Sequence, residues 1–188
     1  MKNVFLFLLF VSMTAFSQQF DKKWGEVVAN EKLGKIKTAN SIVSKIYSKA
    51  VKQHNDVEII KCFFYRSKFR QVLEENAQHI ILTDLNQQIS TASGPTKALL
   101  NLIYYSSLRD YYNENRYLIQ RRTNLVSDSD DFLTWTATDF ETKTQIAIEA
   151  TLADEAVLKN TPLTAYEAIF DFFTIDKFKT ENLYNYLL

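Results

Sequence analysis

The sequence is poor in the residues that turn or end regular structure. Its 188 residues include three glycines and two prolines, whereas strands joined by tight turns use both residues heavily. This scarcity argues against a β-rich protein and predicts long helices in an all-α fold. Both methionines, Met1 and Met13, lie near the N-terminus, so we expect a core of leucine, isoleucine, phenylalanine and tyrosine.

Cysteine is almost absent, since Cys62 is the single one. A chain with one cysteine has no internal disulfide and has to fold by packing alone. Cys62 lies within the apolar stretch Ile59–Phe64. Because cysteine is among the most often buried residue types, this position predicts a buried structural thiol.

The residues that carry most enzymatic or metal chemistry are also sparse. His54 and His79 are the only histidines and fall on separate predicted helices, whereas a metal site needs three or four converging ligands. The acidic run Asp128–Asp131 lacks the glycine and glutamate of a calcium loop, and no serine lies in a glycine-flanked elbow. We therefore expect no metal, no cofactor and no catalysis, and an exported enzyme is the least favoured class of function.

The N-terminus has the layout of a secretory signal peptide. Lys2 supplies a positive charge, residues 4–16 are almost continuously apolar, and Ala15 and Ser17 are the small residues of a cleavage site before Gln18. The apolar run is too short to span a bilayer comfortably. We predict a signal peptide at residues 1–17 and export to the periplasm or the extracellular space. No lipid-attachment cysteine follows it, so we expect no stable membrane anchor after cleavage.

The net charge is close to zero, because 22 lysines and arginines balance 22 aspartates and glutamates. Loss of Lys2 with the leader changes this to about −1. A nearly neutral exported domain has no overall field that would hold nucleic acid or an anionic membrane. The composition therefore argues against both as partners.

Hydrophobic periodicity predicts four helices before the strongest break in the mature chain, at Ser93-Gly94-Pro95. The second has the cleanest amphipathic pattern, with apolar residues from Ile36 to Ala50 on one face. The predicted segments are 20–33, which ends at Leu33-Gly34, then 36–50, a restart at Asn55-Asp56, and a helix through Ile80, Ile81, Leu85 and Ile89.

Beyond the break, a fifth helix is expected from Ala98 to about Asn113, followed by a polar loop over residues 125–134. Thr138-x-x-Glu141 and Thr164-x-x-Glu167 match the capping-box pattern and predict two further helix starts. Successive helical hairpins favour a tetratricopeptide-like array in shape, although no exact repeat is present. The predicted domain spans residues 18–188, with possible halves 18–93 and 94–188.

Tyrosines and arginines are dense between residues 104 and 122, a composition that can grip single-stranded nucleic acid. Here Asp110, Glu114 and the acidic loop neutralise the cluster, so we expect an internal electrostatic lock. In this lock, arginines pair with Asp130 and Asp131 over tyrosine rings. Arg116 is the expected bridge, because a planar guanidinium can join two segments.

The same stretch carries a resemblance to a known family. Tyr111–Tyr117, Arg122-Thr123, Asp130-Asp131 and Thr134-Trp135 form a succession that resembles the N-terminal helical region of bacterial alpha-2-macroglobulin-like proteins. The resemblance implies a non-catalytic docking or structural module of a secreted protease-binding protein, with downstream domains of the same polypeptide, and proteases through them, as partners. The expected structural anchor in this stretch consists of Asn115, Arg116, Arg122, Asp130, Asp131 and Trp135. Cys62, followed by Phe63-Phe64, does not match the family's thioester motif.

The last residues begin an apolar helical face, formed by Leu183, Tyr184, Leu187 and Leu188. We expect this face to be uncovered and to dock a following domain, so that the chain is the N-terminal part of a longer protein. The alternative is a stand-alone exported helical-repeat domain that binds a protein partner on its concave face.

Cleavage is expected after Ser17, because Ala15 and Ser17 fit the small-residue positions of the signal-peptidase site. N-terminal sequencing of exported material checks this. A mature chain that starts beyond Phe20 would count against the assignment.

Overall fold

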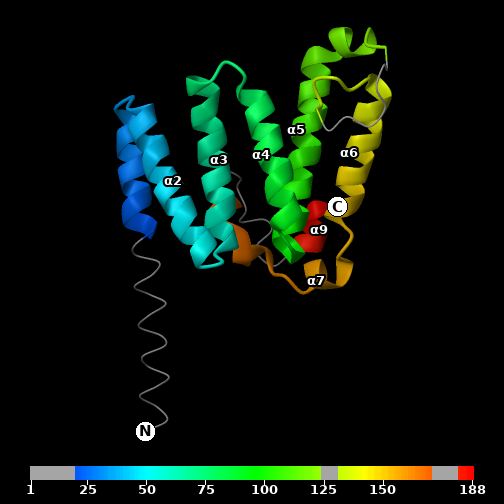
Figure 1. Cartoon of the computed structure of the whole chain (residues 1–188). Coiled ribbons are helices and arrows are strands. Elements are labelled where there is room, and N and C mark those ends of the chain that lie inside the picture. The colour runs from blue at the N-terminus through cyan, green and yellow to red at the C-terminus, as the bar shows by residue number, and fades with distance from the viewer. Residues whose placement is uncertain (1–19, 124–130, 171–181) are drawn as a thin grey trace. The chain divides into compact units, whose positions relative to one another are not determined.

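The computed structural model describes residues 20–123, 131–170 and 182–188, and the predicted leader at 1–17 lies outside these ranges. Within the described residues all regular structure is helical and no strand occurs, so the all-α fold is confirmed (Figure 1). The chain divides into two compact units, Met1–Glu75 and Asn76–Leu188. This division lies earlier than the expected one at residues 93 and 94, because the helix before Ser93 belongs to the second unit.

The described part of unit 1, from residue 20 on, contains three helices, at residues 20–32, α2 (Ile36–Lys52) and α3 (Asp56–Leu73). The first helix ends as the sequence predicts, at Gly34, whose φ of 70° lies in the left-handed region that favours glycine. The Gly34 N–H donates to the Glu31 carbonyl and the Lys35 N–H to the Asn30 carbonyl, which is the hydrogen-bond pattern of a Schellman cap.

The amphipathic pattern of α2 is confirmed, since Ala39, Val43, Ile46 and Ala50 are all buried. The restart at Asn55 is also confirmed, because its side chain accepts a hydrogen bond from the Glu58 N–H and caps α3. The core of unit 1 joins the three helices through one cluster of buried residues: Phe20, Trp24, Val27, Ala39, Val43, Ile46, Ala50, Cys62 and Phe69.

Cys62 is the structural thiol that the sequence predicts. Its side chain is completely buried, and its Sγ donates to the Val43 carbonyl of α2 at 3.8 Å. Burial raises the pKa of the Cys62 thiol to about 12, because desolvation penalises the thiolate. The thiol is therefore protonated at neutral pH and packs as a small apolar group.

Glu58 places a carboxylate at the edge of this core. The indole N–H of Trp24 donates to Glu58 Oε2 at 2.7 Å, and the Trp24 ring packs on Tyr65 with centroids 4.7 Å apart. Burial raises the pKa of the Glu58 carboxyl, and the hydrogen bond from Trp24 offsets part of this rise. Trp24 and Glu58 thus tie the first helix to α3.

Unit 2 begins with α4 (Ala77–Thr91) and α5 (Gly94–Gln120), separated by the predicted break at Ser93-Gly94-Pro95. Pro95 occupies the first turn of α5, where its missing N–H costs nothing. The helix continues beyond the expected end at Asn113 and remains buried at Ile119. Tertiary packing on the segment after it favours this extension, a contribution that the local pattern does not contain.

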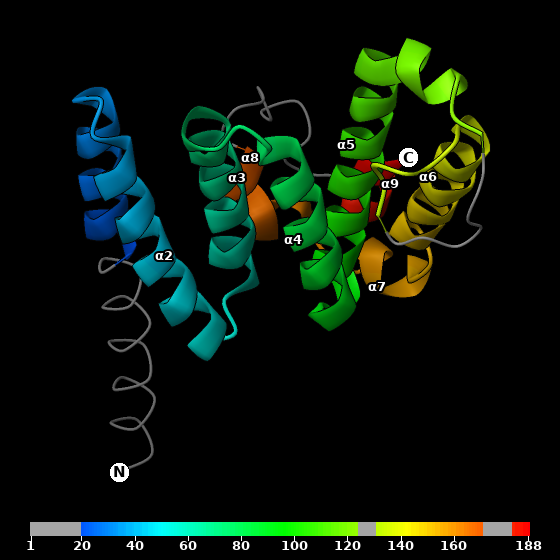
Figure 2. The same ribbon diagram turned by 45° about the horizontal axis from the view of Figure 1, so that its top comes forward.

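The next helix, α6 (Ala137–Thr151), lies beside α5 in both views (Figures 1 and 2). It does begin with a capping box, but the expected residues Thr138 and Glu141 are wrong. Thr136 is the N-cap, and its side chain and backbone exchange hydrogen bonds with Asp139. The pairs Thr136/Asp139 and Thr138/Glu141 have the same spacing, so spacing alone cannot choose between them. Burial of Phe140 against α5 favours the helix start at Thr136.

Short helices complete the described part of unit 2: α7 (Glu155–Lys159), a 3-10 turn at Leu163–Tyr166, α8 (Glu167–Phe170) and α9 (Leu183–Leu187). Thr164 lies inside the 3-10 turn, so the predicted capping box at Thr164 and Glu167 is wrong. Pro162, which precedes this turn, fixes an extended backbone that favours the earlier start. Buried Thr96 of α5 bonds the Tyr166 hydroxyl at 3.0 Å and holds this segment in place.

Glu58→Gln should change the pH dependence of stability. The pKa of Glu58 is higher in the folded protein than in the unfolded chain, so the protonated carboxyl stabilises the fold at low pH. Wild-type protein loses this contribution to the free energy of unfolding as pH rises from below 4.5 through the pKa of the folded state. Glutamine mimics the protonated form, so the free energy of unfolding of the variant minus that of wild type should increase between about pH 4 and pH 7. Urea unfolding at both pH values measures it.

Glu26→Gln is the matched control, because the hydrogen bond from Lys23 lowers the pKa of Glu26. Its stability relative to wild type should change in the opposite direction, and only slightly, since the pair is exposed. If the free energy of unfolding of Glu58→Gln minus that of wild type stays constant or falls with pH, the raised pKa of Glu58 is contradicted.

Candidate functional site

An aromatic cluster fixes α6 and the segment before it against α5. Phe132, Trp135 and Phe140 are buried, and Tyr111 of α5 packs on both Phe132 and Phe140, with centroids 4.9 and 5.8 Å apart. Trp135 meets Phe140 edge to face at 5.3 Å. Aromatic pairs of this geometry are worth about 0.5–1.5 kcal/mol each beyond their area burial. The cluster therefore provides a rigid base for whatever binds beside it.

Arg122 closes this cluster from the end of α5. Its Nη1 donates to the Trp135 carbonyl at 2.9 Å and approaches the Phe132 carbonyl at 3.5 Å. The segment between these two carbonyls folds as a compact turn, in which the Thr134 N–H and hydroxyl both donate to the Asp131 carbonyl. One guanidinium thus holds the turn that delivers Trp135 to the core.

The structure brings together two of the six expected anchor residues, Arg122 and Trp135, although Arg122 binds a carbonyl where the sequence led us to expect a carboxylate. Asp131 approaches His79, with Oδ1 3.6 Å from Nε2. Asn115 donates to the Tyr111 carbonyl within its own helix. Asp130 lies outside the described residues.

Arg116 does not have the expected environment. Its side chain is exposed, and in the described part of the chain no hydrogen bond or ion pair joins it to the segment after α5. The end of α5 at Gln120 explains this, because Arg116 lies on an exposed face of the helix, whereas Arg122 lies beyond the helix end and reaches the Trp135 carbonyl. The predicted role of a buried bridge therefore belongs to Arg122 among the described residues.

The expected docking face at the C-terminal end is largely covered. Leu183 and Leu187 are buried within unit 2, Tyr184 is half-buried beneath Lys159, and Leu188 is 76 % exposed. The Leu183 N–H donates to the Thr161 carbonyl, which holds α9 beside α7. The expectation that these four residues leave an apolar face open is thus wrong for Leu183 and Leu187.

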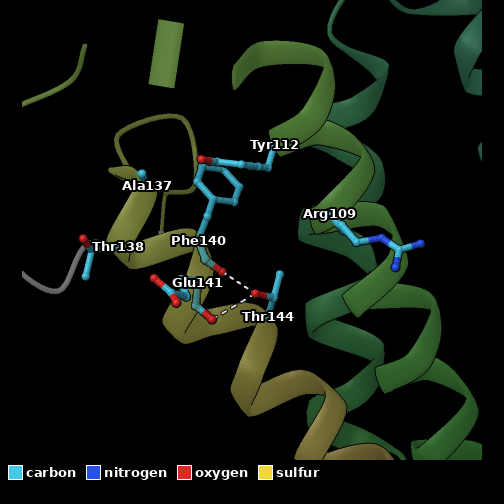
Figure 3. Close-up of a pocket in the computed structure, with 7 residues that line it drawn as sticks. All are labelled: Arg109, Tyr112, Ala137, Thr138, Phe140, Glu141 and Thr144. Atoms are coloured by element: carbon cyan, nitrogen blue, oxygen red, sulfur yellow. Dashed lines mark hydrogen bonds between the residues drawn. The ribbon is translucent and has the colours of Figure 1, made fainter. Parts of the chain in front are cut away.

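Two surface clefts lie along the α5–α6 pair. The smaller, of about 300 Å³, is lined by Arg109 and Tyr112 of α5 and by the first turns of α6. Figure 3 shows the rings of Tyr112 and Phe140 next to one another, with centroids 5.7 Å apart. The Thr144 hydroxyl is turned back onto the carbonyls of Phe140 and Glu141. Glu141 at its rim gives this cleft mixed charge.

The larger cleft, of about 400 Å³, lies among α4, α5 and α6, and we call it the lysine cleft. Lys97 of α5 and Lys143 of α6 contribute its charges, and its lining contains no carboxylate among the described residues. Asn101, Tyr104 and Trp135 add polar and aromatic surface. Its aliphatic lining consists of Ile89, Ile146, Ala147 and Ala150.

Two contacts hold side chains of the lysine cleft in place. Lys143 Nζ lies 5.5 Å from the centroid of the Trp135 ring, so the cation sits over an aromatic face. Asn101 is buried and donates from Nδ2 to the Lys97 carbonyl one turn earlier. The cleft therefore combines a positive rim with an apolar and aromatic floor, which suits a ligand that carries both an anionic and an apolar group.

Sequence reasoning missed the lysine cleft. Lys97, Asn101 and Tyr104 are spaced i, i+4, i+7, and Lys143, Ala147 and Ala150 repeat that spacing, so each set marks one helix face. This spacing can be read from the sequence, but it does not show which helix faces pack against one another. The pairing of α4, α5 and α6 supplies that information.

Within the described ranges no group of three or more histidine, cysteine, aspartate or glutamate residues is placed to hold a metal ion. Nor does any described helix combine the length and the apolar character needed to cross a bilayer. Comparison with protein-family models, with curated proteins and with solved structures gives no match to this chain.

Arg122→Ala should destabilise unit 2 by about 1–3 kcal/mol, because the Trp135 carbonyl loses its charged donor in a partly buried place. Arg122→Lys should recover only part of this loss, since the lysine side chain is shorter and its ammonium group is more strongly hydrated than a guanidinium. Urea unfolding followed by tryptophan fluorescence measures both variants.

Arg116→Ala is the matched control on the same helix, and its exposure predicts a change within about 0.5 kcal/mol. A loss as large as that of Arg122→Ala would return the anchoring role to Arg116.

Proposed function

We propose that this chain is a non-catalytic helical docking module that binds a segment of a partner polypeptide in the lysine cleft. The observation that carries the proposal is the cleft itself, with two lysines, a tryptophan and aliphatic side chains around a volume of about 400 Å³. This volume falls within the range of small-ligand and side-chain sites. Lys97 and Lys143 would take a carboxylate of the partner, and Ile89 with the exposed Ile146 would take an adjacent apolar side chain.

The rigidity of the surroundings supports this role. Trp135 belongs both to the lysine cleft and to the aromatic cluster, where its carbonyl accepts from Arg122. A binding surface whose side chains are already ordered loses less conformational entropy when it binds. The lysine cleft can bind a polypeptide segment without a catalytic group, which fits a docking module.

The resemblance to alpha-2-macroglobulin-like proteins suggests the larger protein to which this module would belong. In the proposed form, residues 1–17 are a cleaved signal peptide, the helices are a tetratricopeptide-like array, and the module is the N-terminal helical region of an exported protease-binding protein. Its partners are then downstream domains of the same polypeptide, with proteases reached through those domains. A coding frame that continues past Leu188 into β-rich domains is the observation that this setting requires.

A stand-alone exported interaction domain is the second candidate, and one observation favours it. Leu183 and Leu187 are already buried within unit 2, so covering these two side chains does not require a following domain. In this form the lysine cleft binds a separate protein, and the physical basis of recognition is the same.

Blocking the lysine cleft should abolish peptide binding. A phage library of random peptides selected on the wild-type chain should enrich sequences that combine aspartate or glutamate with an apolar residue. Ala150→Trp fills the cleft from α6, and it should weaken binding of the selected peptides by tenfold or more, which is about 1.4 kcal/mol. Fluorescence anisotropy with a labelled selected peptide measures the affinity.

Ala153→Trp is the matched control, because Ala153 is exposed just beyond α6 and does not line the cleft. It should bind the same peptides as wild type. Failure to select any peptide, or equal losses in both variants with circular dichroism unchanged, would sink the proposal.

A further inference from the structure

The balanced net charge of the chain conceals an uneven distribution between its two units. Residues 20–75 contain 12 lysines and arginines against seven aspartates and glutamates, whereas residues 76–188 contain nine against 15. Although the whole chain is neutral, unit 1 carries an excess of positive charge over residues 20–75 that can attract an anionic surface. The local field within about one Debye length, roughly 10 Å, is what a surface contact senses.

Five of the 12 lysines and arginines of unit 1 lie on the side where the first helix meets α2. Lys45, Lys49 and Lys52 are spaced i, i+4, i+7 and so share one face of α2. On the first helix, Lys22 and Lys23 lie near Glu26, whose pKa is lowered first by the Lys23 hydrogen bond and then by the charges of Lys23, Lys22 and Lys45. These five lysines form what we call the lysine face.

The character of the lysine face indicates what kind of partner it fits. Its cations are lysines alone, which act as hydrated point charges, whereas specific recognition of single carboxylate or phosphate groups favours arginine. Thr38 and Ser41 continue the α2 stripe with short polar side chains, and both are exposed. The cleft described in unit 1 is lined by Thr38 but not by Ser41, and none of the five lysines lines it. A broad surface of dispersed negative charge matches this arrangement better than a shaped ligand.

We propose that the lysine face docks unit 1 on an anionic phospholipid surface. Lysines near such a surface contribute about equally and without sharp geometry, and four to eight of them suffice for reversible attachment. The attachment is peripheral and separate from the lysine cleft of unit 2.

A second copy of the chain is the main competing partner, since unit 2 has an excess of carboxylates. Its described acidic side chains are spread over several elements, and several already have partners. Glu155 binds Lys159, Glu114 accepts from Gln78, and Glu149 accepts from Gln145. A dispersed and partly neutralised set offers weaker complementarity than a lipid surface.

The test is co-sedimentation of the exported chain with lipid vesicles. It should bind vesicles of phosphatidylcholine with about one third phosphatidylglycerol, and not vesicles of phosphatidylcholine alone. Raising sodium chloride from about 0.05 to 0.5 M should release it, because screening shortens the range of the field. Added inorganic phosphate at matched ionic strength should have no further effect, since a surface and not a single phosphate is bound.

The double variant Lys22→Glu, Lys45→Glu should reduce partitioning about tenfold or more. The matched control is Arg116→Glu, Arg121→Glu, which makes the same change of charge at exposed positions of unit 2 and should bind as wild type. Circular dichroism checks that both remain folded. Equal losses in the two variants, or no binding of wild type to anionic vesicles, would overturn the proposal. Salt-sensitive self-association by sedimentation velocity, lost in the first variant without vesicle binding, would assign the face to a second copy.

Discussion

The packing of Trp135 and Phe140 against α5 is the constraint on which unit 2 depends. A helical pair without a disulfide can hold its register only through side chains that interlock, and Arg122 completes this interlock by binding the Trp135 carbonyl. The same tryptophan forms part of the lysine cleft. The residue that determines the stability of the α5–α6 pair therefore also fixes the geometry of the proposed binding site.

Unit 1 also folds without a disulfide, and its stability depends on a core shared by its three described helices. Its core joins three helices through aliphatic and aromatic side chains, with the protonated thiol of Cys62 packed between α2 and α3. The hydrogen bond from Trp24 to Glu58 leaves one carboxylate half-buried at the edge of that core. The polar surface that remains is dominated by lysine, which gives unit 1 a separate electrostatic character from unit 2.

Two proposals thus rest on different features of one chain. The lysine cleft offers shape, two cations and an apolar floor, and this combination selects a defined segment of a partner. The lysine face offers charge without shape, and this combination suits a dispersed anionic surface. A module that attaches to a membrane through one unit and captures a polypeptide through the other would keep its partner at that membrane.

The sequence by itself determined the helical class, the amphipathic face of α2, the cap at Gly34 and the burial of Cys62, because these depend on local spacing and residue type. The identity of the bridging arginine, the start of α6 and the burial of Leu183 were decided by tertiary structure. Arg116 and Arg122 carry the same guanidinium group, and the fold distinguishes them, because α5 ends at Gln120 and Arg122 beyond it reaches the Trp135 carbonyl. The charge asymmetry was likewise present in the sequence but had no meaning until the unit boundary at Glu75 was known, because an electrostatic field depends on which charges fold together.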